Sequence, residues 1–346
     1  MHCIGIFMKS KKSKKIKFII ILILFFFIIP VFLFEIIGQM FVFKHKLYFI
    51  NDVAHRMDPS KYDDVNSDGI RSDVEADEFM PEDVNIIFLG DSFVYGYKLN
   101  SDQSVPHQLE TKLRALYPNK KINIANFGWV SSSPLLSYDL LKDIGKKYHP
   151  DYVILGVDMT DIHDDIKYKC LIERKGIYNL LDVVPITFLA IQKALSKGRF
   201  DSLHETIFRF PARRFFASDK PLSETRHYFS DIQSNIDLIN QFTTETLGAK
   251  FRLFVFPRTY QYSDKECPNN WEKAEYKLLG EYALEPFKYF SEIKALKEYP
   301  IDSLLLDFKS AQIKPTSFND DPHWNEAGVK VVVDAIYRAC VKDNWF

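Results

Sequence analysis

The sequence predicts a three-layer α/β/α domain, doubly wound around a mostly parallel five-stranded sheet of the flavodoxin-like kind, and preceded by one N-terminal transmembrane helix. The helix is indicated by a long apolar run behind a cluster of lysines. The sheet is indicated from residue 84 onward, where short apolar segments alternate with segments whose apolar residues recur every three to four positions. Strands that alternate with helices imply right-handed crossovers and a parallel sheet.

The N-terminal run, "FIIILILFFFIIPVFLF" (18–34), follows the basic stretch "KSKKSKKIK" (9–17). Its length is at the lower end of the roughly 17–25 residues that span a bilayer. Because the lysines come first, the positive-inside rule places residues 1–17 in the cytoplasm, an anchor over 18–38 in the membrane, and the rest outside. The sequence thus predicts a single-pass protein of a bacterial inner membrane, with its main domain on the periplasmic or extracytoplasmic side.

A cleaved signal peptide is the alternative interpretation of the same run. Its apolar region would be shorter, about 7–15 residues, and a small-residue cleavage site would follow. The residues that follow, "EIIGQMFVFKHK", contain no A-x-A pattern. This favours an uncleaved anchor.

Composition restricts the classes of partner. The 346 residues suffice for one large domain or two small ones, and 45 basic against 46 acidic residues leave no basic stripe of the kind that binds nucleic acid. Four cysteines are too few for a disulfide scaffold, and none has metal-ligand spacing. We expect no nucleic-acid partner, no metal and no cofactor.

The elements of the domain follow in order along the chain. Residues 39–82 are predicted as a linker and lead-in, and 83–346 as the domain. Five apolar segments are predicted as strands: "VNIIFLG", "KINIANFG", "DYVILGV", "KFRLFVFP" and "DSLLLDF". Four segments with helical periodicity lie between or after them: "DQSVPHQLETKLRALY", "LLSYDLLKDIGKKY", "FSDIQSNIDLINQFTTETL" and "NEAGVKVVVDAIYRACV".

Two insertions interrupt the alternation, at about 162–228 and 258–300. In the first, "LLDVVPITFLAI" is too short for a second span and predicts a docked amphipathic helix. Long connections at the carboxyl ends of strands usually build substrate sites. In the second insertion, Tyr260, Tyr262 and Trp271 either stack on sugar rings or belong to the core.

Cys170 and Cys267 follow the third and fourth predicted strands. Their placement in loops at one edge of the sheet suggests a disulfide that tethers the two insertions in an oxidising compartment. Free thiols are the alternative.

The first predicted strand leads directly to a candidate nucleophile. In "IIFLGDSFVYGY" (86–97) the apolar run stops at Gly-Asp-Ser. Ligands of open α/β sheets bind at the carboxyl ends of the strands, so Ser92 is a candidate nucleophile at a strand tip. The alternative is that Ser92 caps a helix.

The loop before the last predicted helix supplies partners for Ser92. In "FNDDPHWNEAGVK", Asp320 lies three residues before His323. An Asp can hold the tautomer of a His whose other nitrogen takes the proton of a serine. The alternative is that Asp320 and Asn325 are helix-capping residues and that His323 lies on the surface.

These two stretches, "GDSFVYGY" and "DDPHWNEAG", resemble the first and fifth blocks of the SGNH (GDSL) hydrolase superfamily, and the resemblance covers roughly residues 63 to 342. "NSDGIRSD" resembles the Asn-x-x-Gly-x-Arg lead-in of membrane-anchored members. The resemblance implies Ser92 as nucleophile, His323 as base and Asp320 as the residue that orients it.

The lead-in also fits another pattern. In "DVNSDGIRSDVE", five residues are in register with a calcium-binding loop: Asp64, Asn66, Asp68, Gly69 and Glu75. A polar turn rich in Asn, Asp and Gly needs no metal to explain it.

The resemblance implies an oxyanion hole with two departures from the family pattern. Its donors would be the Ser92 amide, the Ser131 amide where the family has glycine ("NFGWVSSSP"), and Thr160 where the family has asparagine ("GVDMTDIHDD"). A threonine hydroxyl has one donor hydrogen and a shorter reach than an amide. This substitution leaves room for a weak hydrolase, a specialised one or a transferase.

The expected function is a serine-dependent O-acyl ester hydrolase or acyltransferase that acts outside the cytoplasm on an acylated small molecule or carbohydrate, such as acylated envelope or exported polysaccharide. The alternative is a non-catalytic carbohydrate-binding or assembly subunit that keeps the SGNH fold. The sequence identifies no protein partner.

Overall fold

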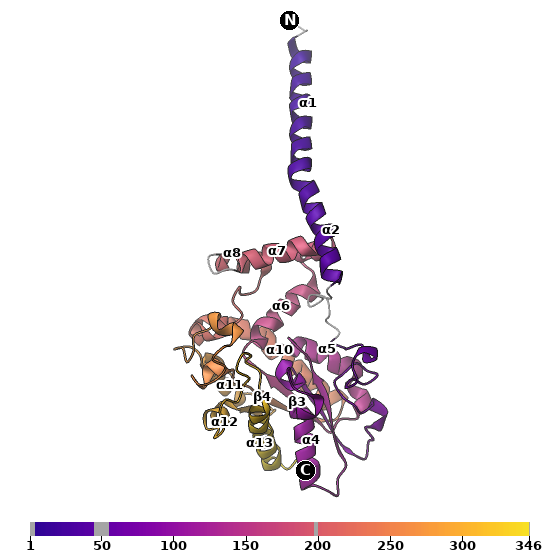
Figure 1. Ribbon diagram of the computed structural model, residues 1–346, viewed down its shortest axis with the longest axis vertical. Coiled ribbons are helices and arrows are strands. Elements are labelled where there is room, and N and C mark those ends of the chain that lie inside the picture. The colour runs from indigo at the N-terminus through magenta and orange to yellow at the C-terminus, as the bar shows by residue number, and fades with distance from the viewer. Residues whose placement is uncertain (1–3, 45–54, 197–199, 346) are drawn as a thin grey trace. The chain divides into compact units, whose positions relative to one another are not determined.

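The computed structural model describes residues 4–44, 55–196 and 200–345 (Figure 1). Its sheet has five parallel strands in the order β2-β1-β3-β4-β5, which confirms the predicted fold class. The strands are β1 (Val84–Gly90), β2 (Ile122–Gly128), β3 (Tyr152–Val157), β4 (Lys250–Val255) and β5 (Ile301–Ser303). In the register of β1 and β2, Gly90 pairs with Gly128, so both strands end at the same edge.

Helices cover both faces of this sheet. The side chains of Ile86 and Phe88 pack with helices α4 (Val105–Leu116) and α13 (Glu326–Lys342). Neighbouring side chains of a strand point to opposite faces. The other face is covered by α5 (Pro134–Ile144), which contacts β1, β2 and α10 (Phe229–Gln241).

The remaining helices connect these layers or lie outside them. They are α1 (Ile4–Ile23), α2 (Ile29–Lys44), α3 (Ser92–Tyr95), α6 (Asp161–Glu173), α7 (Pro185–Leu195), α8 (Asp201–Phe208), α9 (Leu222–Thr225), α11 (Glu285–Lys294) and α12 (Leu305–Lys309).

The chain divides into two units. The first comprises Met1–Asp52 and Glu173–Arg209, and the second comprises Val53–Ile172 and Phe210–Phe346. The predicted linker and lead-in (39–82) is divided between the units after Asp52, and Glu173–Arg209 of the first predicted insertion belongs to the first unit.

The first unit contains a helix of 28 residues, Lys14–Phe41, that is long and apolar enough to cross a membrane. It runs through α1, a π-helical turn at Leu24–Ile28 and α2. The predicted docked helix in "LLDVVPITFLAI" is α7, which packs against α2.

The structure corrects the fifth predicted strand. Only Ile301–Ser303 pairs with β4, and much of "DSLLLDF" is helix α12. Leu304 and Phe308, four residues apart, are buried, whereas Leu306 is 75% exposed. Burial at a spacing of four residues is helical rather than alternating.

The structure also distinguishes between alternatives that the sequence left open in the insertions. Tyr260 and Tyr262 are buried, so they belong to the core and are not available to stack on a sugar, whereas Trp271 is 61% exposed. Cys267 is a free thiol, which contradicts its predicted disulfide with Cys170.

Candidate active site

Ser92 is the first residue of α3, at the carboxyl end of β1. The N-cap of this helix is Asp91, whose carboxylate accepts the Phe93 amide at 2.9 Å, so Ser92 itself is not the capping residue. The short helix lies tightly over β2, because a Cβ added at Gly128 would stand 2.3 Å from the Tyr95 nitrogen. A glycine at that position lets the backbone of α3 approach the sheet.

Ser92 is hydrogen-bonded to His323 from the far end of the chain. The distance from Ser92 Oγ to His323 Nε2 is 2.7 Å. The other ring nitrogen, Nδ1, is hydrogen-bonded to Asp321 Oδ1. The rings of Phe93 and Tyr97 flank the imidazole, with centroid distances of 4.9 and 4.7 Å. This is the geometry of a serine nucleophile, a general base and a carboxylate that orients the base.

The structure corrects the expectation for Asp320. Its side chain is 68% exposed and accepts a hydrogen bond from Lys98 Nζ at 3.0 Å, while that of Asp321 is 8% exposed. The His323 amide donates to Asp321 Oδ1 at 3.0 Å, a local turn that directs this carboxylate inward. Burial raises the pKa of Asp321, but hydrogen bonds from His323 and the charge of Lys98 outweigh burial and lower the pKa overall.

The loop that carries His323 is held by a buried glutamate from the second insertion. Glu266 accepts hydrogen bonds from the amides of Thr316 and Ser317, at 2.9 and 3.0 Å, and from both hydroxyls, at 3.1 and 2.6 Å. Asn325 caps α13 by accepting from two amides of its first turn. Glu266 is therefore a positioning residue that the sequence did not reveal.

The lead-in segment supports the other end of the nucleophile turn. Arg71 donates to the carbonyl oxygens of Tyr95, Gly96 and Leu99 at 2.8–3.0 Å, and its Nε donates to Asp64. A guanidinium thus satisfies carbonyls at the end of α3.

The other oxygens of the calcium-loop pattern also have protein partners. Asp68 accepts from Lys147 and Tyr148, and Glu75 accepts from Ser67.

The resemblance assigns two backbone amides, those of Ser92 and Ser131, to the oxyanion hole. Within the described residues, neither the Ser92 nor the Ser131 N–H donates to a protein acceptor. Ser131 has a φ of 58°, in the left-handed region that favours glycine. Ser131 therefore has a backbone conformation that glycine usually adopts, at the position where the resemblance implies a glycine.

The structure corrects the expectation for Thr160. Its hydroxyl donates its one hydrogen to Asp158 Oδ1 at 2.6 Å, and its amide donates to the same oxygen at 2.6 Å. The hydroxyl in turn lies 3.4 Å from Arg214 Nη2. Arg214 comes from the later part of the first predicted insertion, and its side chain is 28% exposed. A cationic donor therefore lies beside the position where the family has an amide.

A buried network of charges lies behind this position. Arg258 donates to Asp158 Oδ2 at 2.6 Å and to Glu272, and Glu272 also accepts from Arg214 at 3.1 Å. The guanidinium of Arg258 stands 5.4 Å from the centroid of the Phe93 ring. The network thus joins the tips of β3 and β4 to the nucleophile turn.

Asp91, Asp158 and Asp161 have ligand oxygens within 4.8 Å of one another, the spacing at which carboxylates can share a cation. The guanidinium of Arg258 pairs with Asp158 and supplies positive charge at this cluster. Burial and the charge of Asp158 raise the pKa of Asp91 to about 8. Burial and the charge of Asp91 raise that of Asp161, whose Oδ1 has no hydrogen-bond partner among the described residues. Burial raises the pKa of Asp158, but the charges of Arg258 and Arg214 and the hydrogen bonds from Thr160 outweigh burial and lower the pKa overall.

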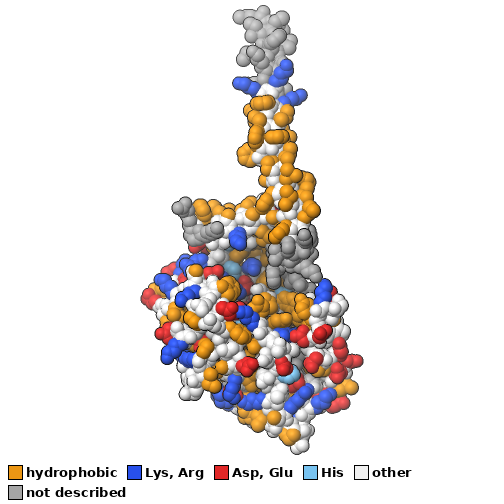
Figure 2. Space-filling view, in the orientation of Figure 1, with side chains coloured by type: hydrophobic (Ala, Val, Ile, Leu, Met, Phe, Trp, Pro, Cys, Tyr) orange, Lys and Arg blue, Asp and Glu red, His pale blue; other side chains and the backbone are white. Residues whose placement is uncertain are grey.

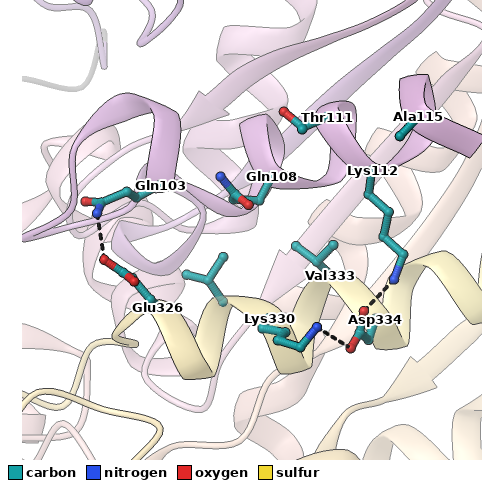
Figure 3. A pocket seen from close by; sticks show the side chains of 10 residues that line it. Gln103, Gln108, Thr111, Lys112, Ala115, Glu326, Lys330, Val333 and Asp334 are labelled. Carbon is teal, nitrogen blue, oxygen red and sulfur yellow. Dashed lines mark hydrogen bonds and ion pairs between the residues drawn. The ribbon is translucent and has the colours of Figure 1, made fainter.

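A separate hollow of about 510 Å³ lies between α4 and α13 (Figure 3). Ion pairs and hydrogen bonds cross or line it, among them those of Gln103 with Glu326 and of Lys112 with Asp334. It contains none of Ser92, Asp321 and His323, so it is distinct from the catalytic arrangement.

The comparisons with known proteins find distant similarities among solved structures. No protein-family model matches the sequence, and a search of curated proteins finds no match. Among solved structures, TesA is 10% identical over 74% of this chain and 97% of its own, with a TM-score of 0.41. The esterase EstA from Pseudoalteromonas sp. is 14% identical over 75% and 98%, with a TM-score of 0.41. Axe2, an acetyl-xylooligosaccharide esterase from Geobacillus Stearmophilus, is 13% identical over 75% and 95%, with a TM-score of 0.42. The function is therefore argued from the site itself.

Proposed function

We propose that this chain is a serine-dependent O-acyl ester hydrolase or acyltransferase of the SGNH superfamily, tethered to a bacterial inner membrane and active outside the cytoplasm. The observation that carries the proposal is the continuous hydrogen-bonded series Ser92, His323 and Asp321 at the carboxyl ends of the strands.

In the proposed reaction Ser92 Oγ attacks the acyl carbonyl carbon while His323 Nε2 takes the hydroxyl proton. Asp321 stabilises the imidazolium that forms. The tetrahedral intermediate collapses as His323 returns the proton to the leaving alcohol oxygen, which gives an acyl-Ser92 ester. Water in a hydrolase, or an acceptor hydroxyl in a transferase, then attacks the acyl carbon while His323 takes its proton. The bond between the acyl carbon and Ser92 Oγ breaks, and His323 returns the proton to Ser92 Oγ.

The negative charge on the intermediate faces the amides of Ser92 and Ser131. We propose Arg214 as the third contributor, because the hydroxyl hydrogen of Thr160 is committed to Asp158 and Arg214 lies against the Thr160 oxygen. A donor of this kind is typically worth about 10²–10³ in turnover.

The proposed location rests on the charges that flank the apolar helix. Lys14, Lys15 and Lys17 precede its apolar residues, which places the N-terminus inside by the positive-inside rule. The proposed substrate is an acylated small molecule or carbohydrate, and the exposed Trp271 is a surface on which a sugar ring can stack.

The test is turnover by the full chain in detergent or lipid, on p-nitrophenyl esters of increasing acyl length and on an acetylated oligosaccharide, with and without an acceptor alcohol. We expect ester cleavage that Ser92→Ala abolishes, and acyl transfer to the acceptor identifies a transferase. Binding of the oligosaccharide by a folded protein that cleaves none of these esters would instead support the non-catalytic alternative.

A further inference from the structure

The first unit contains a contact that the proposed catalysis does not use. Glu35, on α2, is 3% exposed although it follows directly on the apolar run. Its carboxylate accepts the amides of Ile186 and Thr187, both at 2.9 Å, and the Thr187 hydroxyl at 3.0 Å. These are the first-turn groups of α7, so a carboxylate of the anchor helix caps the start of another helix.

The two helices also approach closely. A Cβ added at Gly38 would stand 2.6 Å from Ile186 Cγ2, so a glycine one turn after Glu35 admits the side chain of Ile186. Gln39 donates to Glu35 at 2.9 Å and completes the contact. One face of α2, at positions 35, 38 and 39, is therefore specialised for α7.

The other faces of α2 at this level remain apolar and uncovered. Ile37 is 65% exposed and Met40 is 68% exposed. In the proposed anchor, exposed isoleucine and methionine at this level favour a position that is still in contact with the apolar part of the bilayer. Because Glu35 binds the start of α7, α7 would begin near the depth where the proposed anchor meets the membrane surface.

We define the α7 segment as Gly176–Asp182 and Pro185–Leu195 with the two valines between them. It exposes apolar side chains, as an element at the membrane surface does. Val183 is 70% exposed and Ile191 40%, while Phe188 is buried. Within the first unit α7 lies crosswise to the anchor helix, and hydrophobic side chains gather at this junction (Figures 1 and 2). A helix that lies crosswise to a membrane-spanning helix runs along the membrane surface rather than through the bilayer.

We infer that the α7 segment is an interfacial membrane-binding element, seated at the boundary between headgroups and acyl chains and docked on the anchor through Glu35. Its partner is the lipid bilayer itself. Apolar residues of such an element are buried roughly 5–10 Å into that boundary. The inference rests on the proposed membrane anchor.

The position of this element in the chain gives it a consequence for the site. The chain enters it at the end of α6, which carries Asp164, and returns shortly before Arg214, which is paired with Asp164. Both connections of the segment thus lead to the ion pair of Asp164 with Arg214, the residue that we propose as a contributor to the oxyanion hole.

The test uses the full chain with Cys3→Ser, in phosphatidylcholine–phosphatidylglycerol vesicles, with nitroxide labels at single introduced cysteines. Power saturation compares accessibility to oxygen, which partitions into lipid, with accessibility to a water-soluble nickel chelate. The labelled positions are Val183 and Ile191 in the α7 segment, Phe25 in the anchor (63% exposed), and Leu296 in the second unit (79% exposed) as the matched apolar control.

We expect an oxygen-to-nickel ratio several-fold higher at Val183, Ile191 and Phe25 than at Leu296. A lipid-exposed Phe25 with Val183 and Ile191 equal to Leu296 would overturn the inference and leave the anchor standing. A water-exposed Phe25 would overturn the anchor and, with it, the inference.

A second variant tests the docking contact. Glu35→Ala should lower the ratio at Ile191 and leave that at Phe25 unchanged, whereas Lys193→Ala, on the exposed side of α7, should change neither. If Glu35→Ala leaves the label at Ile191 as it was, docking through Glu35 is wrong.

Discussion

The two adjacent aspartates before His323 give the sharpest test of the site. Asp321 is hydrogen-bonded to His323 Nδ1, whereas Asp320 is exposed and pairs with Lys98. Asp321→Asn keeps the size of the side chain but removes the charge that holds the imidazole in one tautomer and stabilises the imidazolium. Asp320→Asn removes the neighbouring charge and leaves that contact intact, so it is the matched control.

The size of the effect follows from the contacts. The same exchange of the orienting aspartate lowers turnover by about 10⁴ in a serine protease with this arrangement. At about 1.4 kcal/mol per tenfold change, this corresponds to roughly 5.5 kcal/mol of lost transition-state stabilisation. Asp321→Asn should therefore lower the rate by about 10³–10⁴. An exposed ion pair such as that of Asp320 with Lys98 contributes about 0–1 kcal/mol to stability, so Asp320→Asn should have little effect.

The assay is the rate of covalent labelling by a fluorophosphonate, measured together with the melting temperature of each variant. We expect the large loss for Asp321→Asn at nearly unchanged melting temperature, and little change for Asp320→Asn. A large loss for Asp320→Asn with normal labelling by Asp321→Asn would refute the assignment and restore the expectation from sequence.

Four further predictions concern the groups around the triad. Arg214→Met should lower the labelling rate by about 10²–10³; equal labelling by Arg214→Met and the parent would remove Arg214 from the oxyanion hole. Thr160→Val should lower the melting temperature, with little effect on the labelling rate per folded molecule. Glu266→Gln should destabilise the protein by about 1–3 kcal/mol, because donors of Thr316 and Ser317 lose a charged acceptor, and urea unfolding identical to the parent would contradict the role of Glu266. The pKa of Asp91 is about 8 in the folded chain against an ordinary 3.8, so between these two pH values the folded chain binds a proton that the unfolded chain releases. The contribution of Asp91 to the free energy of unfolding is therefore lost as the pH rises from about 4 to about 8. Asp91→Asn should therefore gain stability over the parent between about pH 4 and pH 8, by at most about 1.4 kcal/mol per pH unit, and a difference in urea midpoint that does not change with pH would contradict this.

The sequence predicted four of the five strands closely because each is a buried apolar run that ends at a recognisable boundary. β1 ends at the glycine before Asp91, where the strand stops and α3 begins. "DSLLLDF" failed because three consecutive leucines have no clear period, and the short β5 leaves most of them to α12.

The site was predictable where chemistry depends on residue type, and not where it depends on geometry. Ser92 and His323 stand in short motifs, and the structure brings them together at 2.7 Å. Asp320 and Asp321 are adjacent and chemically identical, so only the turn of the loop decides which one faces the imidazole. Arg214 and Glu266 lie in insertions, far along the chain from the residues that they contact, and no local pattern marks them.

The most direct test of the central claim is the mass of the full chain after reaction with a fluorophosphonate, followed by peptide mapping of the modified residue. An activated nucleophile at the tip of β1 predicts one adduct per chain, on the peptide that contains Ser92. The adduct should be absent from Ser92→Ala and nearly absent from His323→Ala, because both variants interrupt the same proton transfer. A folded protein that remains unmodified, or an adduct at another serine that persists in Ser92→Ala, would contradict the assignment of Ser92 as the nucleophile.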